Sequence, residues 1–173
     1  MLIDYLKIIL GIILAVLVQY FIIDQVDFGP YVKPYFYLLC FLFLNFERNK
    51  YAQLGLAFFA GFFMDLLHQS YGMHTAACTA TLYFKIKAEG MFLNTEAVSL
   101  QGNHYLTPKF RGFRFYAIYI GLLIALHHFI FFSLDYYKWS SFLTIIISTV
   151  SSTIVSFVFI HLIKIYLIRR EWQ

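Results

Sequence analysis

The stretch LAFFAGFFMDLLHQSYGMHTAACTA places an acid and two imidazoles inside an otherwise apolar run. Asp65 and His68 are three residues apart, so on a helix their side chains share a face, and His74 follows after a short polar break. Carboxylate and imidazole groups are ligands in zinc sites, and they also form proton relays in membrane proteins. His127 and His128 are candidates for the same polar cluster. Since neighbouring helix positions point in different directions, at most one of these two imidazoles is aimed well.

A structural role for the aspartate competes with these reactive roles. Gly61 precedes Asp65 by four residues on the same helical face, and Gly72 permits a tight turn before His74. An ionised carboxylate in an apolar bundle needs a donor, and the free N–H groups at the start of the next helix are close by. We therefore expect Asp65 to pin a helical hairpin, with a metal or transported-proton role as the alternative.

No signature of catalysis accompanies these residues. The sequence has no HExxH motif, no cysteine pair at metal-ligand spacing, no nucleophile motif and no phosphate-binding loop. We therefore predict no catalytic residue, no metal and no cofactor. Cys40 and Cys78 lie in apolar runs, and we expect buried thiols rather than a disulfide.

The composition indicates the class of protein that positions these residues. Of 173 residues, 61% are hydrophobic, 21% aromatic and 13% charged, whereas charged residues make up about 25% of a soluble domain. The sequence therefore predicts an integral membrane protein. We interpret the net charge of +4 as a topology signal rather than a sign of nucleic-acid binding.

The apolar runs predict one transmembrane domain over residues 1–173, an all-α bundle of six helices with short outer loops. A helix needs about 20 residues to cross a hydrocarbon core of about 30 Å. Two of the runs are shorter than that, so five spans is the alternative. The predicted spans are residues 6–23, 34–46, 51–67, 74–88, 115–133 and 139–168.

Basic residues predict the orientation, because Lys and Arg gather in cytoplasmic loops. With both termini cytoplasmic, eleven of the 13 Lys and Arg residues fall on the cytoplasmic side, and only Lys33 and Lys138 lie outside. The opposite orientation would place those eleven on the wrong face of the membrane. The eleven are Lys7, Arg48, Lys50, Lys85, Lys87, Lys109, Arg111, Arg114, Lys164, Arg169 and Arg170.

Small residues recur in the first and last predicted spans. Four small hydroxyl residues recur at every fourth position in the first part of the last span, which predicts a helix–helix seam. The alternative is that each hydroxyl bonds back to the carbonyl four residues earlier. Gly11 and Ala15 form a small-xxx-small pair that can dock another helix. The hydroxyl residues are Thr144, Ser148, Ser152 and Ser156.

The hairpin GFFMDLLHQSYGMHTAA resembles that of the rod shape-determining protein MreD family, and the abundance of Phe, Tyr and Lys is similar to members from Bacteroidetes. The resemblance implies a non-enzymatic scaffold of the bacterial cell-elongation complex in the inner membrane. The implied partners are MreC, MreB, membrane lipid, and RodA with its penicillin-binding transpeptidase, and the implied process is control of peptidoglycan synthesis and cell shape. The residues that carry the resemblance are Gly61, Asp65, Leu66, Leu67, Gly72, His74, Ala76 and Ala77.

The MreD family is itself similar to the substrate-binding S-components of energy-coupling-factor vitamin transporters. This similarity implies the main alternative function, in which an outer-face pocket holds a small vitamin. Gly11 and Ala15 would then dock a transporter's scaffold subunit. A third class, an enzyme or ion carrier that uses Asp65 and the histidines, is not expected.

Overall fold

The computed structural model describes residues 2–42, 50–93 and 113–171, and no strand occurs among them. The prediction of an all-α fold is therefore confirmed for this part of the chain. A π-helical turn, η1 (Gln19–Ile23), continues the first helix, and a 3-10 turn, η4 (Trp139–Ser141), precedes the last. The five long helices are α1 (Leu2–Val18), α3 (Lys50–His68), α4 (Met73–Leu93), α7 (Phe113–Tyr136) and α8 (Phe142–Glu171).

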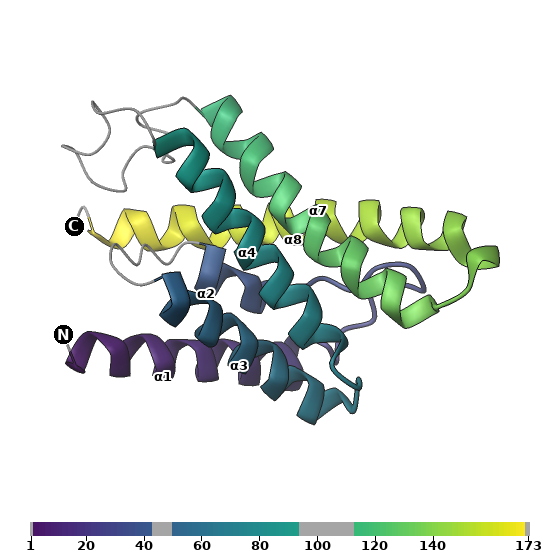
Figure 1. Cartoon of the computed structure of the whole chain (residues 1–173), viewed down its shortest axis with the longest axis horizontal. Helices are drawn as coiled ribbons and strands as arrows, with labels where there is room; N and C mark the ends of the chain where they lie inside the picture. Colours follow the sequence, from purple (N-terminus) through teal and green to yellow (C-terminus); the bar gives the residue numbers. More distant parts are fainter. Residues whose placement is uncertain (1, 43–49, 94–112, 172–173) are drawn as a thin grey trace.

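The long helices pack in a chain of neighbours. α3 packs on α1 and α4, and α7 packs on α4 and α8. Figure 1 shows α4 and α7 crossing obliquely over α8, and α3 crossing obliquely over α1. The beginning of α1 and the end of α8 lie at the same end of the molecule (Figure 1).

Two helices in the described ranges are long and apolar enough to cross a membrane. They are α7 and the portion Phe142–Ile163 of α8, while Ile8–Ile23 forms a shorter apolar helix. α3 and α4, which the sequence also predicts as spans, do not pass the same criterion of length and hydropathy. Polar side chains along both helices account for this difference, among them Gln53 and Lys85.

The chain between α1 and α3 differs from the expected second span at residues 34–46. It is irregular from Gln25 to Tyr35 and then forms only a 3-10 turn, η2 (Phe36–Leu38), and a one-turn helix, α2 (Leu39–Leu42). Residues 43–46 of that predicted span lie outside the described part of the chain. Pro34 fixes its own φ and disfavours helical geometry at the residue before it, so helix formation is delayed until Phe36.

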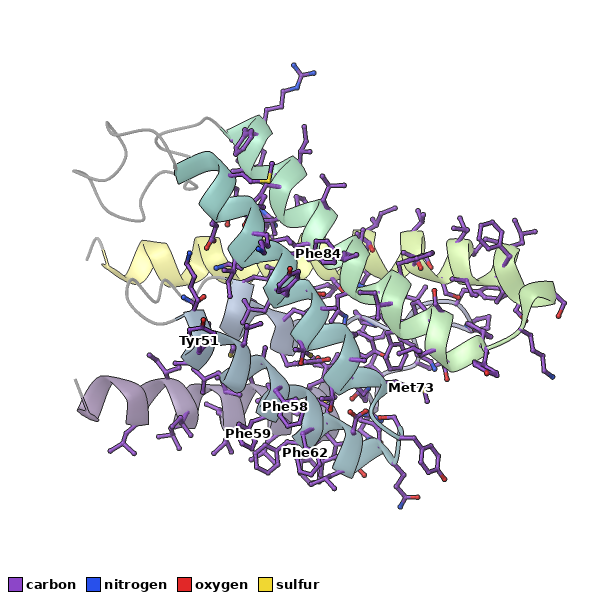
Figure 2. The ribbon with its side chains drawn as sticks, viewed as in Figure 1. Tyr51, Phe58, Phe59, Phe62, Met73 and Phe84 are labelled. Atoms are coloured by element: carbon purple, nitrogen blue, oxygen red, sulfur yellow. The ribbon has the colours of Figure 1, made fainter. Side chains whose placement is uncertain are left out.

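Large apolar side chains lie on the outside of the bundle as well as in its core, and the core also holds several polar side chains. Phe58, Phe59 and Phe62 project from α3, and Phe84 projects from α4 (Figure 2); all four are exposed. On the inside, the Lys85 side chain is buried and its Nζ lies 2.9 Å from Glu89 Oε1. The extent of exposed apolar surface differs from that of a soluble protein, where large apolar patches are rare.

Candidate functional site

Asp65, near the end of α3, accepts hydrogen bonds from the start of α4. Its Oδ1 lies 2.9 Å from the backbone N of His74, and its Oδ2 lies 2.8 Å from the backbone N of Thr75. The hydroxyls of Ser70 and Thr75 each donate at 2.5 Å. The backbone N–H groups of His74 and Thr75 lie in the first turn of α4, where the side chain of an N-cap residue normally accepts from them. Since Gly72, which precedes α4, has no side chain, Asp65 caps α4 from across the hairpin.

Gly61 lets the two helices approach closely enough for this cap to form. A Cβ at Gly61 would lie 2.6 Å from Thr75 Cα and 2.7 Å from both His74 O and Thr75 N. All three atoms belong to the backbone, so they cannot move aside without shifting α4. The four-residue spacing of Gly61 and Asp65 therefore places the closest helix contact and the cap on one face of α3.

The turn between the helices is held in an unusual backbone conformation. Gly72 has φ of 90°, and the non-glycine residues Gln69 and Tyr71 have φ of 54° and 51°. The left-handed region is unfavourable for these two side chains, and contacts with the rest of the hairpin must compensate. One such contact is the hydrogen bond from Ser70 N to Asp65 O, 3.1 Å long. The predicted role of Gly72 as a turn residue agrees with this geometry.

The predicted polar partners of Asp65 separate into different contacts. His68 does not reach Asp65; its Nε2 donates instead to Asp24 Oδ2 at 2.9 Å. His74 turns its ring away, and its Nδ1 lies 3.0 Å from the hydroxyl of Tyr37. In the ranges that the structure describes, no group of three or more His, Cys, Asp or Glu side chains is placed to hold a metal ion.

Tyr37 joins three elements through its buried hydroxyl. Besides His74, this hydroxyl lies 3.1 Å from His127 Nε2 and 3.3 Å from Cys78 Sγ. All four side chains are buried, and both Cys78 and Cys40 are free thiols. The expectation that one of the two adjacent histidines joins a polar cluster fits His127, although the cluster is centred on Tyr37 rather than on Asp65.

The backbone of Lys33–Phe36 enters the bundle before the chain becomes helical. Side chains, most of them buried, act as its hydrogen-bond partners in place of helical carbonyl and N–H groups. Gln19 donates to Pro34 O at 2.9 Å and accepts from Phe36 N at 2.7 Å. His128 lies with Nε2 3.2 Å from Lys33 O and with Nδ1 2.8 Å from Ile124 O. Irregular backbone within a membrane bundle persists only where such partners satisfy it.

Two of the small residues in α8 serve this irregular segment. Ser152 Oγ accepts from Lys33 N at 2.9 Å, and Ser156 Oγ accepts from Tyr35 N at 3.1 Å. The hydroxyl of Ser151, beside the predicted ridge, lies 2.7 Å from Tyr31 O in the same irregular segment and 2.8 Å from Ile147 O, the carbonyl four residues earlier. The predicted helix–helix seam is therefore corrected for these positions: Ser152 and Ser156 accept from irregular backbone, although Ser156 Oγ also lies 3.4 Å from His128 Nε2 on α7.

The other predicted packing positions have weaker contacts. Ser148 is fully buried but its hydroxyl has no hydrogen-bond partner within the described residues, and Thr144 is half-buried. Gly11 is exposed, and a Cβ there would meet no atom within 4 Å. Its carbonyl accepts from Cys40 Sγ at 3.6 Å, and Ala15 packs partly against the core. Gly11 therefore has room to receive a further helix.

The serine contacts give a matched test of the irregular segment. We expect Ser156→Ala to lower the free energy of unfolding by about 1–2 kcal/mol, because it leaves the buried N–H of Tyr35 without an acceptor, and Ser152→Ala to have a smaller effect of about 1 kcal/mol, because the N–H of Lys33 is only partly buried. Ser148→Ala is the control, since its buried hydroxyl binds nothing in the described structure. Thermal unfolding of the purified proteins in one detergent measures the difference. Equal effects of the three substitutions would contradict the assigned contacts.

A cavity of about 430 Å³ lies at the end of the bundle formed by the α3–α4 turn, the irregular segment and the end of α7. A hydrogen-bonded pair, Asp24 with His68, and an ion pair, Lys33 with Asp135, line it; Lys33 Nζ and Asp135 Oδ2 are 3.3 Å apart. Its volume falls in the range of small-molecule sites. The aromatic rings of Tyr35, His74 and Phe131 also line the cavity.

Comparisons of the chain with protein-family models, with curated proteins and with solved structures give no match. Function is therefore inferred from the chain's own residues. Two arrangements stand out among them, the hairpin that Gly61 and Asp65 hold together and the polar cavity at its turn.

Proposed function

We propose that this chain is a non-enzymatic membrane scaffold of a bacterial cell-elongation complex, similar to MreD. The observation that carries the proposal is the α3–α4 hairpin. Gly61, Asp65 and His74, on which the resemblance to MreD depends, belong to one contact in which α4 is capped and held against α3. The most polar part of the hairpin thus has a structural explanation, which favours a scaffold over a protein that turns over a substrate.

The proposal includes insertion in the inner membrane with both termini cytoplasmic. Exposed aromatic and aliphatic side chains on α1, α3 and α8, together with the polar interior, suit a lipid environment. The beginning of α1 and the end of α8 share one end of the molecule, as this topology requires (Figure 1). The cavity then opens on the outer side.

The proposed partners are MreC, MreB, and RodA with its penicillin-binding transpeptidase. We expect the tagged protein, solubilised with mild detergent from its host, to co-purify with MreC, as measured by quantitative mass spectrometry. Asp65→Asn should reduce MreC recovery in proportion to the loss of folded protein, whereas Asp27→Asn, an exposed acid outside the hairpin, should not. Recovery of neither MreC nor RodA with well-folded protein would rule out the scaffold role.

A second candidate function is the substrate-binding component of a vitamin transporter. The observation that favours it is the cavity of about 430 Å³ on the proposed outer side. In this case the purified protein should retain a stoichiometric small molecule and co-purify with a transporter scaffold subunit and not with MreC. Native mass spectrometry of the purified protein separates the two candidates.

A further inference from the structure

We propose that the cavity at the α3–α4 turn binds a primary ammonium group carried on an apolar or aromatic body. The site is independent of the scaffold proposal. It would give the second candidate function a ligand class.

The charge of the cavity favours a cation. Asp24 and Asp135 contribute two negative charges and Lys33 one positive charge, so with neutral imidazoles the lining carries a formal charge of −1. Lys33 is half exposed, and its contact with Asp135 is therefore weak. One further ammonium would make the lining neutral.

Two buried side chains in the lining have polar atoms available for such a ligand. Tyr35 is 3% exposed and His74 is 2% exposed. In the described part of the chain the Tyr35 hydroxyl has no hydrogen-bond partner, and His74 bonds only through Nδ1, to Tyr37, which leaves Nε2 on the far side of the ring. If Nδ1 donates to Tyr37, then Nε2 is an acceptor.

The acceptors in the cavity match the donors of an ammonium group. Tyr35 lines the cavity together with Asp24 and Asp135. Asp24 is anchored by Gln19 Nε2 at 2.7 Å and by His68, yet a carboxylate can accept more hydrogen bonds than these two. Asp24 and Tyr35, together with His74 Nε2 when Nδ1 donates to Tyr37, therefore offer three acceptors for an ammonium in the lining of one cavity.

The side-chain ammonium of Lys33 already binds at the edge of this cavity. Its Nζ lies 3.3 Å from Asp135 Oδ2 and 6.0 Å from the centroid of the Phe131 ring. This combination of a carboxylate and an aromatic face is typical of cation recognition. The rings of Phe131 and Tyr35, with centroids 5.1 Å apart, supply an apolar wall for the body of the ligand.

The test compares 2-phenylethylamine with its neutral counterpart 2-phenylethanol, by isothermal titration of the purified full-length protein in detergent. We expect the amine to bind and the alcohol to bind at least ten-fold more weakly, because charged hydrogen bonds contribute that much. Asp24→Asn should weaken amine binding about ten-fold, and Asp135→Asn should also weaken it. Asp27→Asn, an equal charge change outside the lining, should have no effect.

A second arm asks whether the ammonium comes from a lipid. The protein is placed in nanodiscs with phosphatidylethanolamine or its N-acetyl derivative, and retained lipid is measured by native mass spectrometry. Retention of phosphatidylethanolamine alone, lost in Asp24→Asn or Asp135→Asn, supports the proposal with a lipid source. Binding of amine and alcohol with equal affinity, or binding that neither substitution changes, overturns it. So does the absence of ammonium-dependent binding in both arms.

Discussion

Gly61→Ala is expected to destabilise the protein by about 2 kcal/mol, the usual effect of forcing an extra methyl group into a packed site. The added Cβ would lie 2.6 Å from the Cα of Thr75, and the backbone of α4 cannot avoid it by a change of rotamer. The two helices must separate, and the hydrogen bonds of Asp65 lengthen with them. Thermal unfolding in a single detergent, with chemical denaturation as a second measure, gives the size of the loss.

Gly55→Ala is the matched control, because it makes the same change on the same helix. A Cβ at Gly55 meets no atom within 4 Å. Removal of a helical glycine reduces backbone entropy in the unfolded chain, so Gly55→Ala should be neutral or stabilising by up to about 1 kcal/mol. If both substitutions have the same effect, the close approach of α3 and α4 is not the reason for the glycine.

Asp65→Asn should cost about 3 kcal/mol, because the carboxylate accepts from two backbone N–H groups and two hydroxyls. An asparagine retains only one oxygen, and its amide NH₂ would face donors that Asp65 now satisfies. Unfolding of the purified variant measures this cost. Asp27→Asn is the control, and it should change stability by less than about 0.5 kcal/mol because the residue is exposed.

The same variant separates a cap from a recognition residue. As a cap, Asp65 affects membrane levels, stability and partner binding together. A variant of normal stability that no longer captures MreC would show instead that the carboxylate contacts a partner. Normal stability with normal capture would show that neither role is essential.

The helices and the hairpin could be predicted because their signals are local. Apolar runs indicate helices, and a glycine and an aspartate four residues apart indicate one helical face. The short separation between Asp65 and His74 made a contact across the turn a reasonable expectation. The free N–H groups at the start of the next helix were expected donors, and the structure identifies them as the amides of His74 and Thr75; spacing did not show that the imidazoles of His68 and His74 would bond elsewhere.

The irregular segment and the cavity could not be predicted, because their contacts join distant residues. The four-residue spacing of Ser152 and Ser156 predicts a ridge of hydroxyls on one helical face. Such a ridge has the same sequence pattern whether a helix or a segment of irregular backbone packs against it. His68 has Asp65 three residues away in sequence but selects Asp24, 44 residues away. Gln19 does carry a signal in the sequence, because a polar residue within the apolar first span indicates a buried polar partner.

The irregular segment is synthesised early, but its backbone hydrogen bonds can be completed only late in synthesis. Lys33 and Tyr35 leave the ribosome 119 and 121 residues before the serines that accept their N–H groups. Until those serines have been made, the segment has no complete set of acceptors within the chain, which in the proposed bilayer setting favours a position near the aqueous interface. Completion of its hydrogen bonds must therefore follow synthesis of the serines in α8.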